Sequence, residues 1–208
     1  MSEPMTDDQW RTYYDAMANT PPRPTLLFAL SRFDEEKRQS SDTVPLAIDL
    51  GCGEGRDTVE LLRRGWCVLA IDAQEEGIRR LRARPDMPSD ALLETQVARF
   101  ENQTLPESAA LLLNASFSLP FCHPAYFAML WEQILGSLMP RGRFSGQLFG
   151  DRDGWAGRDG MTHHTRTNAE TLLAPLIIER FEEEERDGTT VSGAPKHWHI
   201  FHIVARKP

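Results

Sequence analysis

The chain has 208 residues, of which 40% are hydrophobic and 26% charged, a balance typical of one globular domain with a short extension. Its formal net charge is −8, and its basic residues are scattered along the chain. Nucleic-acid binders usually carry a basic stripe that contacts phosphates, so this class is disfavoured. The three cysteines form no CxxC pair, which excludes a disulfide framework and a zinc-finger site.

The N-terminal stretch MSEPMTDDQW has neither the basic nor the apolar region of a secretory signal. No apolar run approaches the ~18 residues that a bilayer-spanning helix needs. We therefore expect a cytoplasmic protein that contacts no membrane and no nucleic acid, and that is a monomer or a homodimer.

Two helices are predicted ahead of the core. Within residues 1–20, spacings of three and four put aromatic and apolar side chains on one helix face: Trp10, Tyr13, Tyr14 and Met17. After the proline-rich stretch 21–24, Thr25 is a candidate N-cap for a helix that runs to about Lys37. We expect residues 1–40 to form a helical extension or cap, and residues 41–208 to form the main domain.

Strands and helices then alternate, which predicts a parallel sheet covered by helices on both faces. Apolar runs predict five strands, over 46–50, 67–72, 94–100, 110–114 and 143–149. Helices are predicted over 58–64, 75–84, 126–138 and 168–173. Two further strands, 176–185 and 197–205, complete the chain. The last is apolar on both faces and belongs inside the sheet, whereas the glutamates at 182–185 suit an exposed edge.

The most informative stretch is Asp49-Leu50-Gly51-Cys52-Gly53-Glu54-Gly55, which lies between the first strand and the following helix. Glycines there let the backbone turn sharply and approach a ligand closely, at the strand ends where open α/β sheets bind ligands. The GxGxG spacing, followed by Arg56, departs from the GxGxxG of dinucleotide-binding loops. A loop of this kind suits S-adenosylmethionine (SAM), which carries no phosphate, and Asp49 is placed near the amino-acid portion of such a ligand.

A second acidic residue, Asp72, closes the second predicted strand. A carboxylate at this point can accept hydrogen bonds from both hydroxyls of a ribose. The same arrangement suits NAD, and Asp72 could instead be the N-cap of a helix that begins at Ala73. Asp72 alone therefore does not distinguish among these roles.

Residues 46–81 resemble the SAM-binding half of class I SAM-dependent methyltransferases. The motif of that superfamily, Asp/Glu-x-Gly-x-Gly-x-Gly, is matched by Asp49, Gly51, Gly53 and Gly55. The resemblance implies a three-layer, Rossmann-like open α/β sheet of seven strands in the order 3-2-1-4-5-7-6, with the last strand antiparallel. Within the superfamily, the Gly55-Arg56-Asp57 sequence, the compact length and the aromatic N-terminal helix are similar to small tellurite-resistance-type and other small-molecule methyltransferases.

The resemblance also implies a cofactor, SAM with S-adenosylhomocysteine (SAH) as its product, and a set of residues that bind it: Asp49, Gly51, Cys52, Gly53, Gly55, Asp72, Ala73, Phe100 and Asn114. The superfamily often has an acidic residue after the third strand that bonds adenine. Here Arg99 or Phe100 stands at that place, which leaves Glu101 or backbone groups for the contact. Phe100 packs either against the base or in the core.

Candidate acceptor-binding residues come from three segments: the N-terminal helix and the residues after it, the end of the fourth strand, and a Gly-rich loop after the fifth. They are Trp10, Tyr14, Arg23, Ser116, Phe117, Asp151 and Trp155. No catalytic residue is assigned. His163, His164 and Asp151 are candidates for a general base, and an acceptor that needs little activation is favoured.

The sequence thus predicts a SAM-dependent methyltransferase (EC 2.1.1.-) that acts on a small-molecule acceptor. The alternatives are an NAD(P)-binding oxidoreductase and a non-catalytic SAM-binding protein of the same fold. No metal is expected, because His197 and His199 share one face of the last strand but are too few ligands by themselves. Cys122 is expected to be a buried small apolar residue rather than a nucleophile.

Overall fold

The computed structural model describes residues 7–17, 20–36 and 44–208. Its helices are α1 (Asp7–Met17), α2 (Pro24–Glu35), α3 (Arg56–Arg63), α4 (Glu75–Arg82), α5 (Pro124–Ser137) and α6 (Arg166–Leu173), with 3-10 turns η1 (Phe100–Asn102) and η2 (Leu119–Phe121). Its strands are β1 (Leu46–Leu50), β2 (Cys67–Asp72), β3 (Leu93–Val97), β4 (Ala110–Ala115), β5 (Leu138–Gly150), β6 (His163–His164), β7 (Ile177–Thr189) and β8 (Pro195–Arg206). No helix in these ranges is both long and apolar enough to cross a membrane.

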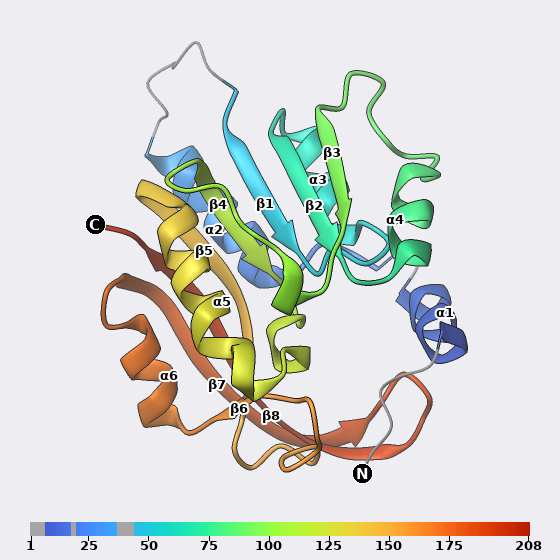
Figure 1. Cartoon of the computed structure of the whole chain (residues 1–208), viewed down its shortest axis with the longest axis vertical. Helices are drawn as coiled ribbons and strands as arrows, with labels where there is room; N and C mark the ends of the chain where they lie inside the picture. The colour runs from blue at the N-terminus through green and yellow to red at the C-terminus, as the bar shows by residue number, and fades with distance from the viewer. Residues whose placement is uncertain (1–6, 18–19, 37–43) are drawn as a thin grey trace.

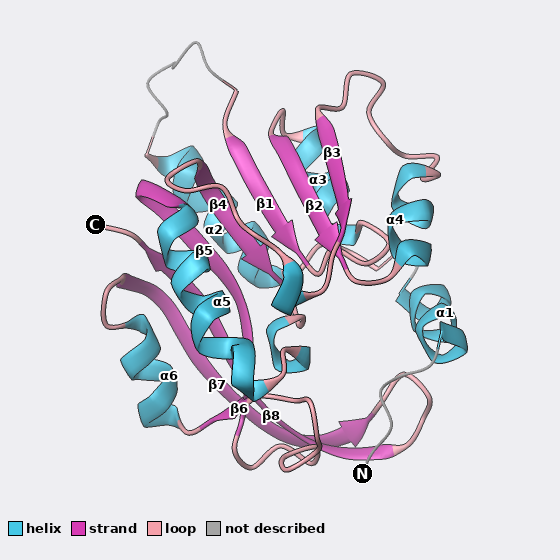
Figure 2. Ribbon diagram, in the orientation of Figure 1, coloured by secondary structure: helices cyan, strands magenta, loops and turns pink. Residues whose placement is uncertain are grey.

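The strands form one sheet in the order β3-β2-β1-β4-β5-β8-β7 (Figures 1 and 2). Strands β1 to β5 pair in parallel, and β8 runs antiparallel to both of its neighbours. The predicted order 3-2-1-4-5-7-6 with an antiparallel last strand is therefore confirmed. The two-residue strand β6, which pairs with β5, is an addition that the sequence did not predict.

Helices cover both faces of the sheet. Successive side chains of each strand point to opposite faces, so each face contributes to a core of its own. One core combines α2, α3 and α4 with sheet residues such as Ala47, and the other combines α5 and α6 with sheet residues such as Ile48. Helix α2 buries Leu26, Ala29, Leu30 and Phe33 in the first core. It thus belongs to a helix layer of the sandwich, and the division at residue 40 stays a prediction.

Several element boundaries differ from the prediction. Helix α3 begins at Arg56, two residues earlier than expected, and β3 ends at Val97, so that Phe100 lies in η1. Thr25 is not the N-cap of α2: Arg23 holds that position without a side-chain cap. The Thr25 hydroxyl instead accepts a 2.8 Å hydrogen bond from the Gln147 amide. The predicted helix end at Lys37, the loop at 39–43 and residues 1–6 lie outside the described residues.

A buried arginine joins the sheet to α2 and to the edge strand. Arg143 of β5 has no exposed surface, and its guanidinium donates to Glu179 of β7 at 2.7 Å and to Glu36 after α2 at 2.5 Å. It also lies 4.4 Å over the Phe33 ring. The pairing register of β7 shifts between Ile178 and Arg180, and a bulge of this kind re-aims a side chain. The bulge in the edge strand therefore directs Glu179 towards Arg143, and their ion pair covers one end of the core.

Replacing Arg143 by alanine should remove the buried, hydrogen-bonded cation from Glu36 and Glu179 and leave them only Arg141 and Arg206, each at 3.6 Å. It should destabilise the protein by about 3–5 kcal/mol, the usual cost of breaking a buried ion pair. The matched control is Arg186→Ala, which removes an exposed ion pair with Glu184 and should cost less than about 1 kcal/mol. Urea unfolding of both variants measures the difference, and equal losses would contradict the role given to Arg143.

Candidate functional site

The glycine loop after β1 adopts a backbone that only glycine tolerates well. Gly51, Gly53 and Gly55 have φ angles of +77°, +55° and +85°, in the left-handed region that L side chains avoid. A Cβ on Gly51 would lie 2.2 Å from the Ser118 Cβ, and one on Gly55 would lie 2.2 Å from the Leu81 Cδ1. The loop therefore lies directly against the end of β4 and against α4.

A buried polar network lies beneath this loop. Asp49 and Asn114 are register partners on β1 and β4, and the Asn114 amide donates to Asp49 Oδ1 and to Asp57 Oδ2, both at 3.0 Å. Thr58 donates to Asp49 at 2.5 Å, and Ser116 donates to Asp57 at 2.6 Å. Because Asp49 and Asn114 are almost wholly buried, the network fixes the loop and the start of α3 from below.

The two carboxylates in this network make Asp49 easy to protonate. Burial, followed by the nearby Asp57 carboxylate, raises the pKa of Asp49 to about 7. The hydrogen bonds from Thr58 and Asn114 favour the ionised form and offset only part of this effect. Asp49 thus changes charge close to neutral pH.

Asp72 is anchored at the end of β2. Its Oδ2 accepts the backbone N–H of Gly53 and its Oδ1 accepts that of Gln74, both at 2.8 Å. Burial raises the pKa of Asp72, while the backbone hydrogen bonds oppose the rise. Gln74 holds the N-cap position of α4, so Asp72 is not the N-cap, although it bonds that residue's N–H as Asx turns do. Its carboxylate lies between the glycine loop and the exposed Ala73.

Helix α1 packs directly on the glycine loop. Tyr14 is 2% exposed, and its ring lies 3.3 Å from where a Cβ on Gly53 would stand. Its hydroxyl lies 3.0 Å from the corresponding point on Gly77 of α4. An ion pair of 2.6 Å between Asp15 and Arg80 adds to the contact of α1 with α4, and the two helices lie side by side in Figure 1.

Aromatic rings connect α1 to the loop after β5. Trp10 lies edge-on to Phe121 of η2 with ring centroids 5.8 Å apart, and Phe121 is 6.4 Å from Trp155. Trp155 in turn lies 6.2 Å from Phe149. Trp10 and Trp155, which are far apart in the sequence, thus belong to one row of aromatic rings that we call the aromatic row: Trp10, Phe121, Trp155 and Phe149.

The residues after β4 face the segment before α2. Phe117 has a φ of +56°, a strained value for an aromatic residue of the kind that clusters at functional sites. Its N–H donates to the Gln147 side chain at 3.0 Å. The Arg23 guanidinium carbon lies 4.3 Å from the Phe117 ring centroid. Arg23, Ser116 and Phe117, predicted from separate segments, are therefore close together.

Other predicted residues have their contacts elsewhere. The Asp151 N–H donates to the His164 carbonyl, and its carboxylate lies 3.7 Å from the His199 ring. Phe100 is half-buried and packs against the core on the α5 side. Burial lowers the pKa of His164 to about 4 and raises that of the wholly buried Cys122 to about 12. At neutral pH this Cys122 is a thiol, as expected of a buried apolar residue.

One group of side chains in the described ranges has the spacing of a metal site. The ligand atoms of Glu183, Glu185 and His199 lie within 4.8 Å of one another. However, the Arg152 guanidinium donates to Glu183 at 2.8 Å and to Glu185 at 2.7 Å. A cation from the chain itself therefore neutralises the group, which is explained as an ion-pair cluster.

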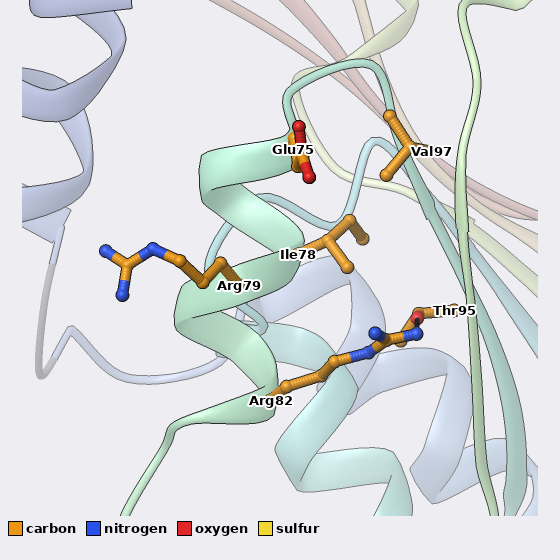
Figure 3. A pocket seen from close by; sticks show the side chains of 6 residues that line it. All are labelled: Glu75, Ile78, Arg79, Arg82, Thr95 and Val97. Carbon is orange, nitrogen blue, oxygen red and sulfur yellow. Dashed lines mark hydrogen bonds between the residues drawn. The ribbon is translucent and has the colours of Figure 1, made fainter.

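Two hollows lie away from these residues. The first, about 240 Å³, lies between α4 and β3 and is lined by Glu75, Ile78, Arg79, Arg82, Thr95 and Val97. Figure 3 shows Ile78 facing β3 and Arg82 reaching to Thr95, to which it donates a hydrogen bond. The second, about 430 Å³, lies at α5 and α6 and includes Trp131, Leu135 and His164. No predicted cofactor- or acceptor-binding residue lines either hollow.

Four residues of this site were not predicted as site residues: Asp57, Thr58, Phe121 and Gln147. Asp57 lies two residues after Gly55, the last glycine of the loop, so its place at the start of a helix was a usable signal. Gln147 alternates with the apolar residues of β5 and is 1% exposed, and a polar residue inside a strand was a weaker signal. Nothing local distinguished Phe121 from a core aromatic.

Comparison with known proteins agrees with this geometry. Residues 47–142 match the family described as "Methyltransferase domain". This part of the chain is therefore similar to a methyltransferase domain. It includes the glycine loop, Asp72 and the end of β4, and the predicted resemblance to class I methyltransferases is confirmed. No curated protein matches the sequence of the chain.

Solved structures share the fold of this chain. TehB from Haemophilus influenzae is 16% identical with a TM-score of 0.73, and the match covers 96% of this chain and 67% of that one. A SAM-dependent methyltransferase from Methanosarcina mazei is 18% identical with a TM-score of 0.64 (90% and 99% covered). Magnesium protoporphyrin IX methyltransferase from Synechocystis PCC 6803, solved with bound SAM, is 12% identical with a TM-score of 0.65 (97% and 92% covered).

The raised pKa of Asp49 predicts a pH-dependent stability. Because the folded state holds this proton more tightly than the unfolded chain, the stability that Asp49 contributes is fully present at low pH and is lost as pH rises from about 4 to about 7. In Asp49→Asn this contribution disappears, so wild type should lose stability relative to the variant over this range, by up to about 1.4 kcal/mol per pH unit. Urea unfolding at a series of pH values measures both curves.

The control is Asp86→Asn. The hydrogen bond from Arg84 lowers the pKa of Asp86, so this group stays ionised above pH 5 in both states. Its curve should run parallel to wild type from pH 5 to 8. If the Asp49→Asn curve is parallel as well, the proton assigned to Asp49 is absent.

Proposed function

We propose that the chain is a SAM-dependent methyltransferase (EC 2.1.1.-) that transfers a methyl group to a small-molecule acceptor. The observation that carries this proposal is the pairing of the left-handed GxGxG loop with a carboxylate, Asp72, bonded to its central N–H. A loop without side chains admits a nucleoside closely, and an acidic residue at this point can accept hydrogen bonds from ribose hydroxyls.

In this proposal the cofactor lies along the loop and contacts Gly51, Gly53 and Gly55 together with the adjacent Asp72 and Ala73. Asp49 is 2% exposed. Asp49 therefore acts on the ammonium group at the amino-acid end of SAM through its electric field, and it also fixes the shape of the loop at Cys52. Asn114 holds the Asp49 carboxylate in place. Phe100 remains the candidate for a contact with the base. Since Tyr14 covers Gly53, α1 acts as the lid that a nucleoside must displace.

The acceptor is placed where β4 ends, between Ser116, Phe117 and the aromatic row. The chemical step breaks the methyl–sulfur bond, whose electron pair stays on sulfur, while an acceptor lone pair forms the new bond to the methyl carbon. The protein's task is to align the two and to exclude water. Trp10 and Trp155 provide apolar walls suited to that exclusion, and Asp151 is the first residue of the loop that carries Trp155.

Two alternatives are tested together with this proposal. An NAD(P)-binding oxidoreductase would need the pyrophosphate loop GxGxxG. Here the position of the third glycine of that motif is occupied by Arg56, which starts α3. A non-catalytic SAM-binding protein would keep the loop and lack turnover. A cytoplasmic location, the absence of a nucleic-acid partner and a monomeric or homodimeric state remain predictions from the sequence.

The decisive experiment is calorimetric titration with SAM, SAH and NADH, followed by methyl transfer to a panel of thiols, phenols, amines and chalcogen oxyanions. We expect binding of SAM and SAH, no binding of NADH, and turnover with at least one acceptor class. Uptake of NADH without SAH would overturn the proposal. Tight SAH binding with no turnover on any class would favour the non-catalytic alternative.

Gly53→Ala should weaken SAH binding by about tenfold or more, because its Cβ would point at the ring of Tyr14 on the face that the cofactor needs. The control, Gly65→Ala, has an equally left-handed backbone at φ +76° but nothing within 4 Å of the added Cβ. Both variants should lose a similar ~1 kcal/mol of stability from backbone strain. An equal effect of both on SAH affinity would show that strain, and not the site, is responsible.

A further inference from the structure

Two arginine side chains meet where α2 and α3 begin. The backbone N–H of Arg23 donates to Asp57 at 2.9 Å, which fixes this residue at the start of α2. Arg56 is the first residue of α3, and its Nε donates to the Pro21 carbonyl at 2.5 Å. With the Arg23 guanidinium over the Phe117 ring, both cations lie next to the end of β4.

Neither guanidinium forms an ion pair with a carboxylate among residues 7–17, 20–36 and 44–208. Most other arginines in these ranges do: Arg32, Arg63, Arg64, Arg79, Arg80, Arg84, Arg99, Arg141, Arg143, Arg152, Arg166, Arg180, Arg186 and Arg206. The charges of two acids, Asp57 and Glu54, act on Arg56. The oxygens of Asp57 already accept hydrogen bonds from Asn114, Ser116 and the Arg23 backbone. Several N–H donors of the pair are therefore left for a ligand.

The surroundings make this pair costly without an anion. Both side chains are half-buried, and burial together with the charge of Arg23 lowers the pKa of Arg56. The Tyr13 hydroxyl is within hydrogen-bonding reach of the Arg23 guanidinium, which adds a neutral polar group to the cluster. Two desolvated like charges at a helix N-terminus are stabilised by a negative ligand, and guanidinium groups bind oxyanions through paired N–H bonds.

We propose that Arg23 and Arg56, with the Tyr13 hydroxyl, form a binding site for an oxyanionic group, such as a carboxylate, a phosphate or a chalcogen oxyanion. The inference deepens the proposed function and rests on it for the identity of the ligand's carrier. The oxyanion is either a group of the methyl acceptor or the carboxylate of the cofactor's amino-acid end. In the first case the site fixes a negatively charged acceptor beside Ser116 and Phe117.

The test compares wild type with Arg23→Gln, Arg56→Gln and Arg23→Lys, by calorimetric titration of the full chain. The probes are SAH, 5′-methylthioadenosine, which lacks the amino-acid end, and inorganic phosphate added to SAH-saturated protein. The control is Arg82→Gln, whose guanidinium also has no carboxylate partner in the described part of the chain but bonds Thr95 at the far side of α4. Thermal unfolding confirms that each variant is folded, and the lysine variant keeps the charge if the glutamine variant does not fold.

We expect both glutamine variants to weaken an oxyanion-bearing probe by about tenfold or more, Arg23→Lys to weaken it less, and Arg82→Gln to leave it unchanged. Weaker SAH binding with unchanged 5′-methylthioadenosine binding identifies the cofactor's carboxylate as the ligand. Unchanged SAH binding with weaker phosphate binding identifies an acceptor oxyanion. Unchanged affinities for both probes, or no phosphate binding to any form together with unchanged SAH binding, overturn the inference.

These outcomes are separate from the proposed function. If wild type binds SAH and the arginine variants bind both probes equally well, the methyltransferase proposal stands and only the oxyanion site is lost. If wild type does not bind SAH, the methyltransferase proposal fails. Phosphate titration of the ligand-free protein and its variants then decides the arginine site alone.

Discussion

The hydrogen bond between Asn114 and Asp49 joins the two central strands of the sheet below the glycine loop. An ionised or protonated carboxylate is costly to bury unless its oxygens are bonded. Thr58 and Asn114 meet that need from α3 and β4, so the loop between them has little freedom. Ser116 and Asp57 extend the same network to the end of β4. The site's geometry therefore depends on a contact buried beneath the loop.

Around this fixed centre, the walls of the site come from distant parts of the chain. Helix α1 supplies Trp10 and Tyr14, and the loop after β5 supplies Trp155. The loop itself is held by a buried ion pair, since Lys196 of β8 bonds both carboxylate oxygens of Asp153, at 2.5 and 2.6 Å. The Lys196 ammonium also lies 3.6 Å from the Trp198 ring centroid, a favourable contact for a desolvated cation. The wall that carries Trp155 is therefore a fixed part of the fold.

Charge distinguishes the two sides of the site. Acids with raised pKa values, Asp49 and Asp72, lie under and beside the glycine loop, where a cationic sulfonium is proposed to bind. The arginines Arg23 and Arg56 lie towards the end of β4, where the acceptor is proposed to enter. Opposite potentials at the two ends orient a charged ligand before any contact forms. Burial strengthens this effect, because it removes the water that would screen the charges.

The order of the strands was expected only from the resemblance to class I methyltransferases. The sequence by itself determined the strands along the chain, the glycine loop, and the positions of Asp49 and Asp72 beside it. These features follow from local patterns: apolar runs set the strands, and left-handed turns require glycine. Only the tertiary structure decided that Asn114 bonds Asp49, that Thr25 bonds Gln147 and is no helix cap, and that Trp10 and Trp155 lie in one aromatic row. It also decided that Arg23 and Arg56 lie together and that neither guanidinium is ion-paired with a carboxylate of the described ranges. Such contacts join residues that are far apart in the sequence, because they depend on the register of strands and the packing of helices. No periodic pattern along the chain reports them.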